Sequence, residues 1–120
     1  MGKEQDFKTM RTVLEGTASV ARNQAEVAKA EYDMLKNEAD KKKKLWDEAL
    51  AAGNTAAAEL YKKEYEAALE AQNEAQDEML SATEAWLEAE KAVIENELKQ
   101  FAQELENMLT DGTSFSFITM

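Results

Sequence analysis

The chain has 120 residues, 44% of them hydrophobic, and a formal net charge of −11 at pH 7. It contains neither cysteine nor histidine, so it lacks the thiolate and the imidazole on which most zinc sites and most nucleophilic and general-base catalysis depend. We therefore predict no enzyme activity, no metal site, no cofactor and no small-molecule ligand.

The acidic excess lies entirely in the second half of the chain. Residues 1–52 hold ten basic and ten acidic side chains, which leaves four basic and fifteen acidic ones for the remainder. An acidic chain of this kind is a poor binder of nucleic acid and of anionic membranes. No apolar run approaches the ~20 residues that cross a bilayer, and the N-terminus lacks the apolar core of a signal peptide. The predicted location is the cytoplasm or, for a viral protein, the virion or the host cytoplasm.

A first helical arm is predicted for about residues 4–51. Helix-forming residues dominate the chain and proline is absent, which favours long helices. Apolar residues recur at alternating spacings of four and three, the pattern of a coiled-coil seam. The one charged member of the stripe, Lys42, can lay its stem along apolar surface and keep its ammonium group in water. The stripe comprises Leu14, Ala18, Ala21, Ala25, Ala28, Tyr32, Leu35, Ala39, Lys42, Trp46 and Ala49.

Two places in this arm leave alternatives open. At Gly16-Thr17, the chain either kinks or ends a short extra helix before residue 17, or it continues as one helix with a weak point, because glycine costs ~1 kcal/mol relative to alanine in a helix. The run Lys41–Lys44 lies between acidic residues. It is either a solvated helix face with local ion pairs or a patch that contacts phosphate.

The turn is predicted at residues 52–55, followed by a second arm over about 55–109. Gly53 suits the left-handed position after a helix end, and Asn54 or Thr55 can cap the next helix. If the chain reverses between Gly53 and Asn54, facing residues have numbers that add up to 107. Leu14 then meets Val93, and Trp46 meets Tyr61. The second stripe, in phase with the first, is Tyr61, Tyr65, Ala68, Gln72, Ala75, Met79, Ala82, Trp86, Ala89 and Val93.

A second line of apolar residues on each arm has no partner in such a hairpin. Two helices cannot cover two separate faces of each, so a third helix, a second copy or absent parts of a longer protein must supply the missing surface. We predict these lines as protein-interaction surfaces that recruit other helices or further copies of the chain. They comprise Val13, Val20, Val27 and Met34 on the first arm, and Leu80, Leu87, Ile94, Leu98, Phe101, Leu105 and Met108 on the second.

Residues 110–120 are predicted to form a short extended tail. Asp111-Gly112 ends the helical pattern, and Phe115 and Phe117 alternate with polar residues, as in a strand. The fold prediction is therefore an all-α, long antiparallel helical hairpin of coiled-coil type with an extended tail. We expect a single helical domain over residues 1–120 that is a fragment of a longer chain.

The run from Tyr61 to Phe115 resembles helical segments of very large tailed-phage virion proteins of the tail tape-measure type. The resemblance rests on "EAQDEML", "TEAW" and "AVIEN" in the helix and on "LTDGTSF" at its exit. It covers roughly half of the chain. Members of that family are long, helical and self-associating, and they act through length and packing without catalytic residues. This chain is much shorter than members of that family and lacks their long apolar segment. Both differences are expected if it is a fragment of such a protein.

Composition, stripes and resemblance together favour a structural or assembly protein that acts through helix packing and self-association, as part of a phage tail. A coiled-coil adaptor or effector module that binds a partner helix is the alternative. An enzyme is disfavoured because histidine and cysteine are missing.

Overall fold

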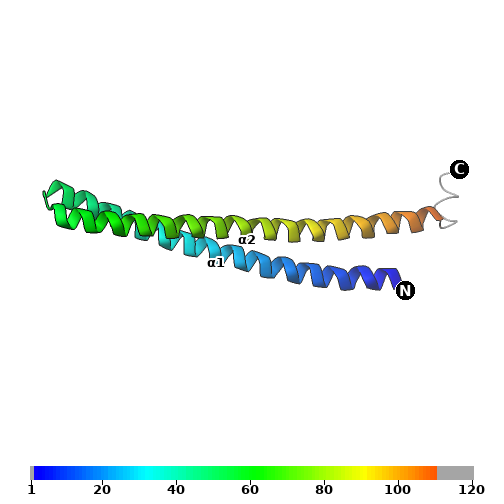
Figure 1. Ribbon diagram of the computed structural model, residues 1–120. Coiled ribbons are helices and arrows are strands. Elements are labelled where there is room, and N and C mark those ends of the chain that lie inside the picture. The colour runs from blue at the N-terminus through cyan, green and yellow to red at the C-terminus, as the bar shows by residue number, and fades with distance from the viewer. Residues whose placement is uncertain (1, 111–120) are drawn as a thin grey trace. The chain divides into compact units, whose positions relative to one another are not determined.

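The computed structural model describes the backbone of residues 2–110 and the side chains of residues 5–110. It contains two α-helices, α1 (Gly2–Ala51) and α2 (Thr55–Thr110), with a turn between them (Figure 1). Every described residue outside positions 52–54 is helical, so the predicted all-α helical hairpin and its turn are confirmed. The expected strand-like segment around Phe115 and Phe117 lies outside the described residues.

The turn satisfies the helix ends with its own backbone and one side chain. Gly53 has φ 71°, a left-handed conformation that costs a residue with a Cβ about 1–2 kcal/mol. The backbone N–H groups of Gly53 and Asn54 donate to the carbonyls of Leu50 (3.1 Å) and Ala49 (3.0 Å), which is the Schellman arrangement at a helix C-terminus. Asn54 also begins α2, because its Oδ1 accepts the N–H of Ala57 at 3.1 Å, as an N-cap does.

The helix α1 runs through Gly16 without a break, so the alternative of a short extra helix before residue 17 is wrong. The Thr17 hydroxyl does not cap a new helix. It donates to the Val13 carbonyl one turn back, at 3.0 Å. A single glycine costs ~1 kcal/mol relative to alanine in a helix. This cost is too small to interrupt the helix when strong helix formers lie on both sides.

Contacts between the helices group the chain into two compact units. The turn unit comprises residues 21–85, and the terminal unit, in its described part, comprises residues 2–20 and 86–110. Each unit contains a piece of both helices. The expectation of a single domain stays a prediction.

The predicted seam is where burial occurs. Every member of the two predicted stripes is buried or half-buried. Among the described residues, however, no large side chain is fully buried. Because alanine removes little apolar surface from water, this core is thin. The buried apolar residues are Ala18, Ala21, Ala25, Ala39, Ala49, Ala58 and Ala75.

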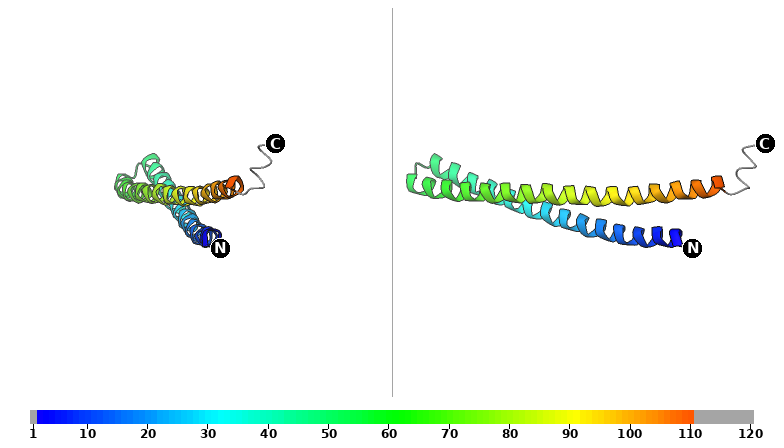
Figure 2. Two further views of the ribbon diagram at one scale, coloured as in Figure 1. Left: turned by 90° about the vertical axis from the view of Figure 1, so that its right-hand side faces the viewer. Right: turned by 45° about the vertical axis from the view of Figure 1, so that its right-hand side comes forward.

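In the turn unit the helices lie side by side next to the turn (Figure 2). The Trp46 ring packs against Tyr65, with ring centroids 5.8 Å apart and planes tilted by 34°. The sequence predicted Tyr61 beside Trp46, one turn away. Helical side chains lean toward the N-terminus of their helix, so in an antiparallel pair Trp46 leans away from the turn and Tyr65 leans toward it. That lean displaces the contact by one turn.

Candidate protein-interaction surface

A row of large apolar side chains lies exposed on the part of α2 that belongs to the terminal unit. Ile94, Leu98 and Phe101 are 56%, 62% and 58% exposed. Residues at these spacings share one side of a helix, whereas the half-buried Ala89 and Val93 mark a different side. We call this row the α2 face. It consists of Leu87, Ile94, Leu98, Phe101, Leu105 and Met108, all of them exposed.

Glutamates border the α2 face on both sides. Glu90, Glu97 and Glu104 each follow a member of the face by three residues, and Glu88 and Glu95 follow one by a single residue. At 100° per residue these positions lie on the two flanks of the row. Two of these carboxylates also accept hydrogen bonds within α2, from the indole of Trp86 to Glu90 at 3.1 Å and from Gln100 to Glu104 at 3.4 Å.

One lysine, Lys91, lies in the row itself between Leu87 and Ile94. It is exposed, and it brings one positive charge to a row bordered by five carboxylates. The α2 face is therefore an apolar row in a predominantly negative setting.

The corresponding row on α1 differs in its surroundings. Val13 and Val20 in the terminal unit are 57% and 56% exposed, and Val27 and Met34 in the turn unit are 67% and 62% exposed. We call these four residues the α1 face. The positions three residues after its members carry no charge: they are Gly16, Asn23, Ala30 and Asn37.

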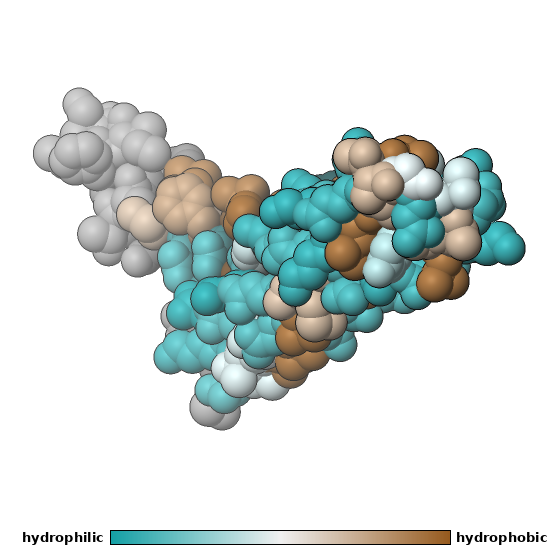
Figure 3. Space-filling model, turned by 90° about the vertical axis from the view of Figure 1, so that its left-hand side faces the viewer, coloured by the Kyte–Doolittle hydropathy of each residue, from teal (hydrophilic) through white to brown (hydrophobic). Residues whose placement is uncertain are grey.

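The turn unit carries further exposed apolar residues. Leu80, which the sequence predicted as an interaction residue, is 52% exposed, and Leu60 is 56% exposed. Figure 3 shows apolar side chains at the surface between hydrophilic ones. All eleven residues of the two predicted lines are thus exposed in the hairpin. Their role in binding stays a prediction.

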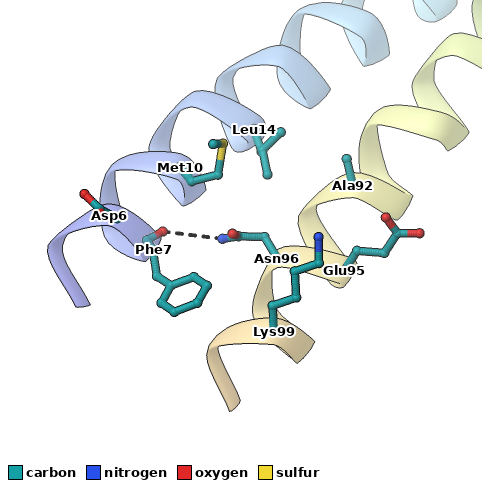
Figure 4. Close-up of a pocket in the computed structure, with 8 residues that line it drawn as sticks. All are labelled: Asp6, Phe7, Met10, Leu14, Ala92, Glu95, Asn96 and Lys99. Carbon is teal, nitrogen blue, oxygen red and sulfur yellow. Dashed lines mark hydrogen bonds between the residues drawn. The ribbon is translucent and has the colours of Figure 1, made fainter. Parts of the chain in front are cut away.

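In the terminal unit a cleft of ≈ 390 Å³ lies between the two helices (Figure 4). Its apolar wall includes Phe7, Met10 and Leu14, and the buried Asn96 lies opposite them. The Asn96 amide donates to the Phe7 carbonyl at 3.4 Å, and one turn further along α2 Gln100 accepts a hydrogen bond from Arg11 at 3.4 Å.

Sequence reasoning missed Asn96, because the predicted stripe stopped at Val93. Continuing the same spacing would have found it, since Asn96, Gln100 and Gln103 follow at intervals of three, four and three. All three are buried or half-buried. The seam thus changes from alanine and aromatic residues to amides, which pack less apolar area.

The basic run near the turn makes one contact between the helices. Lys42 pairs with Glu64 of α2 at 3.2 Å, with both side chains partly exposed at 30% and 39%. Lys41, Lys43 and Lys44 are exposed. This agrees with the interpretation as a solvated face with an ion pair, and the pair lies in the seam position where the sequence placed Lys42.

The described residues contain no cluster of three or more acidic side chains suited to a metal ion. Within residues 2–110, neither helix has a stretch long and apolar enough to cross a membrane. The chain matches no protein-family model, no curated protein and no solved structure. The α1 face and the α2 face are the candidate interaction surfaces of the described residues.

Proposed function

We propose that this protein is a non-enzymatic structural protein that acts by packing further helices against its exposed faces and by self-association. The observation that carries the proposal is the inverted distribution of apolar residues. Among the described residues, the buried apolar positions are all alanines, whereas valine, leucine, isoleucine, methionine and phenylalanine lie exposed in rows. Contiguous exposed apolar surface of this kind marks protein–protein contact sites.

The α1 face is the one suited to a second copy of the chain. On one flank its neighbours Gly16, Asn23 and Ala30 are uncharged, so two copies can meet along this flank without placing like charges opposite each other. Self-association through α1 leaves the α2 face open for another helix.

Self-association is tested by sedimentation velocity of the purified chain over a range of concentrations. We expect the average mass to rise with concentration, and Val20→Glu to return the protein to one chain while its helical circular dichroism persists. The matched control is Ser19→Glu, which adds the same charge at the adjacent exposed position outside the α1 face. This variant should still associate. A stably folded hairpin with the mass of one chain at every concentration would contradict self-association.

We further propose that the assembly is a phage tail, in which the chain serves as a segment of a tape-measure-like virion protein. The support is the resemblance of the Tyr61–Phe115 run to helical segments of such proteins, together with a surface built for helix packing. Peptides of this chain in purified phage particles, and virion genes beside its coding sequence, are the expected findings. Particles that assemble fully without the chain would contradict this location.

The second candidate function is that of an adaptor or effector module that docks a partner helix, and the exposed α2 face favours it. Leu87→Glu or Phe101→Glu should then abolish partner binding and leave the circular dichroism of the hairpin unchanged, because both side chains point outward, 60% and 58% exposed. Unfolding of the whole chain by either substitution would instead mark these residues as internal core.

A further inference from the structure

We infer that the α2 face is built for a basic amphipathic helix of another polypeptide, one with apolar residues at four-three spacing and lysine or arginine on both flanks. The inference deepens the proposed function, on which it rests, by naming the partner class of one face. Three features support it: the spacing of the apolar row, the negative charge beside the row, and the lack of a suitable basic flank on α1 or α2 of a second copy.

The apolar row fixes the form of the partner. Ile94, Leu98, Phe101 and Leu105 follow one another at spacings of four, three and four, and each is at least 43% exposed. A row with this period accepts the side chains of another α-helix between its own, as in coiled coils. A flat sheet or an irregular loop does not match a period of 3.5 residues.

The flanks fix the charge of the partner. In a coiled coil the residues beside the apolar row meet the corresponding residues of the partner helix and decide which partners are accepted. Here those residues include Glu88, Glu90, Glu95, Glu97 and Glu104. Over the described part of α2 there are four basic side chains against fourteen acidic ones, so the wider field has the same sign as the flanks.

A second copy of α2 is a poor occupant. In an antiparallel pair each flank meets the same flank of the other copy, so Glu97 and Glu104 face glutamates. In a parallel pair Glu90 lies opposite Glu95 of the other copy. Like charges placed across such a contact oppose binding.

A second copy of α1 does not supply the missing positive charge either. No lysine or arginine occupies the positions three or four residues after Val13, Val20 and Val27. Within the chain, the only dense basic run is Lys41–Lys44, and Lys42 of that run is already paired with Glu64. The complementary helix is therefore neither α1 nor α2 of a second copy, and we propose that another polypeptide supplies it.

The test uses the full chain and a synthetic helical peptide of about four heptads, long enough to be helical when docked. Leucine occupies its apolar positions and lysine its flanks, and a matched peptide carries glutamate on the flanks. Fluorescence anisotropy of labelled peptide measures affinity at low and high salt. We expect the lysine peptide to bind, less tightly at high salt, and the glutamate peptide to bind at least about tenfold more weakly.

Three variants separate docking from general attraction to an acidic protein. Phe101→Glu adds negative charge but removes a central apolar contact, so it should abolish binding of the lysine peptide if docking requires the face. Glu97→Lys with Glu104→Lys should weaken the lysine peptide about tenfold and admit the glutamate peptide. The control, Glu70→Lys with Asp77→Lys, has the same charge change and the same seven-residue spacing at exposed positions of the turn unit, and it should bind as the unmodified chain does.

Four outcomes would overturn the inference. Equal binding of both peptides would show a face that takes helices without selecting charge, and the proposed function would survive. Equal loss in the control variant, or full binding by Phe101→Glu, would show attraction without docking. Concentration-dependent association of the chain alone that Phe101→Glu removes and Val20→Glu does not would identify a second copy as the occupant. Failure of the proposed function is read separately, from sedimentation of the unmodified chain beside its Val20→Glu variant.

Discussion

At the residue scale, the two described glycines with space around them have opposite roles. Gly53 has a positive φ, whereas Gly16 lies in the regular helix α1, and a Cβ added at either position meets no atom within 4 Å beyond the adjoining backbone. The difference is therefore one of backbone conformation alone. At Gly53 the left-handed backbone allows the hydrogen bonds that close α1, while at Gly16 the missing side chain only lowers helix propensity.

The same substitution at the two positions should therefore have opposite signs. We expect Gly16→Ala to raise the free energy of unfolding by about 0.5–1 kcal/mol, because alanine restricts the unfolded chain and favours the helix. Gly53→Ala should lower it by about 1–2 kcal/mol, because alanine resists a φ near 71°. Urea titration followed by circular dichroism measures both. A loss of stability in Gly16→Ala would mean that this glycine serves a close contact in the assembled protein.

At the element scale, the pairing of the helices near the turn depends on a few larger, half-buried side chains, because the buried apolar positions of the described chain are all alanine. Trp46 and Tyr65 form a ring contact in the turn unit, and Lys42, one helical turn before Trp46 on α1, pairs with Glu64. The ion pair is partly exposed and so contributes at most about 1 kcal/mol. The aromatic pair is the stronger determinant of register, since such pairs add about 0.5–1.5 kcal/mol beyond area burial.

A double-mutant cycle distinguishes the observed register from the neighbouring one. Trp46→Ala and Tyr65→Ala should show a coupling energy of about 1 kcal/mol in unfolding experiments. The control cycle of Trp46→Ala with Tyr61→Ala should give a coupling energy close to zero. A larger coupling energy with Tyr61 than with Tyr65 would contradict the observed ring contact. It would support the pairing predicted from the sequence, in which Trp46 faces Tyr61.

At the scale of the whole molecule, stability and association should be linked. Alanine burial stabilises the hairpin only weakly, and the large apolar residues that would add more are exposed. Covering them in an assembly adds burial that the isolated hairpin lacks. A protein whose folded form associates and whose unfolded form does not is stabilised by raising its concentration.

We therefore expect the melting temperature to rise by about 3 °C for each tenfold increase in protein concentration, the size of effect given by mass action for a dimer of this length. Differential scanning calorimetry at several concentrations measures the shift. Val20→Glu should remove the dependence and Ser19→Glu should keep it. A melting temperature that is independent of concentration in the unmodified chain would show that the hairpin is stable without self-association.

The sequence determined the helices, the turn and the side of each helix that is buried, because these depend on local propensity and on a 3.5-residue period that can be read along the chain. It also identified which apolar rows would be left exposed, because a hairpin of two helices buries only one side of each helix. Leu87, Ile94 and Phe101 were found in this way.

Only the tertiary structure decided the contacts across the seam. The lean of helical side chains moved the partner of Trp46 from Tyr61 to Tyr65, and the second helix placed the Asn96 amide against the Phe7 carbonyl. The structure also decided between the alternatives at Gly16. Whether a helix continues past a glycine depends on the helix propensities and contacts of the residues on both sides, and the glycine alone does not decide it. The spacing of apolar residues predicts which side of a helix is buried. Which atoms come into contact on that side depends on the direction of the side chains and on the partner helix.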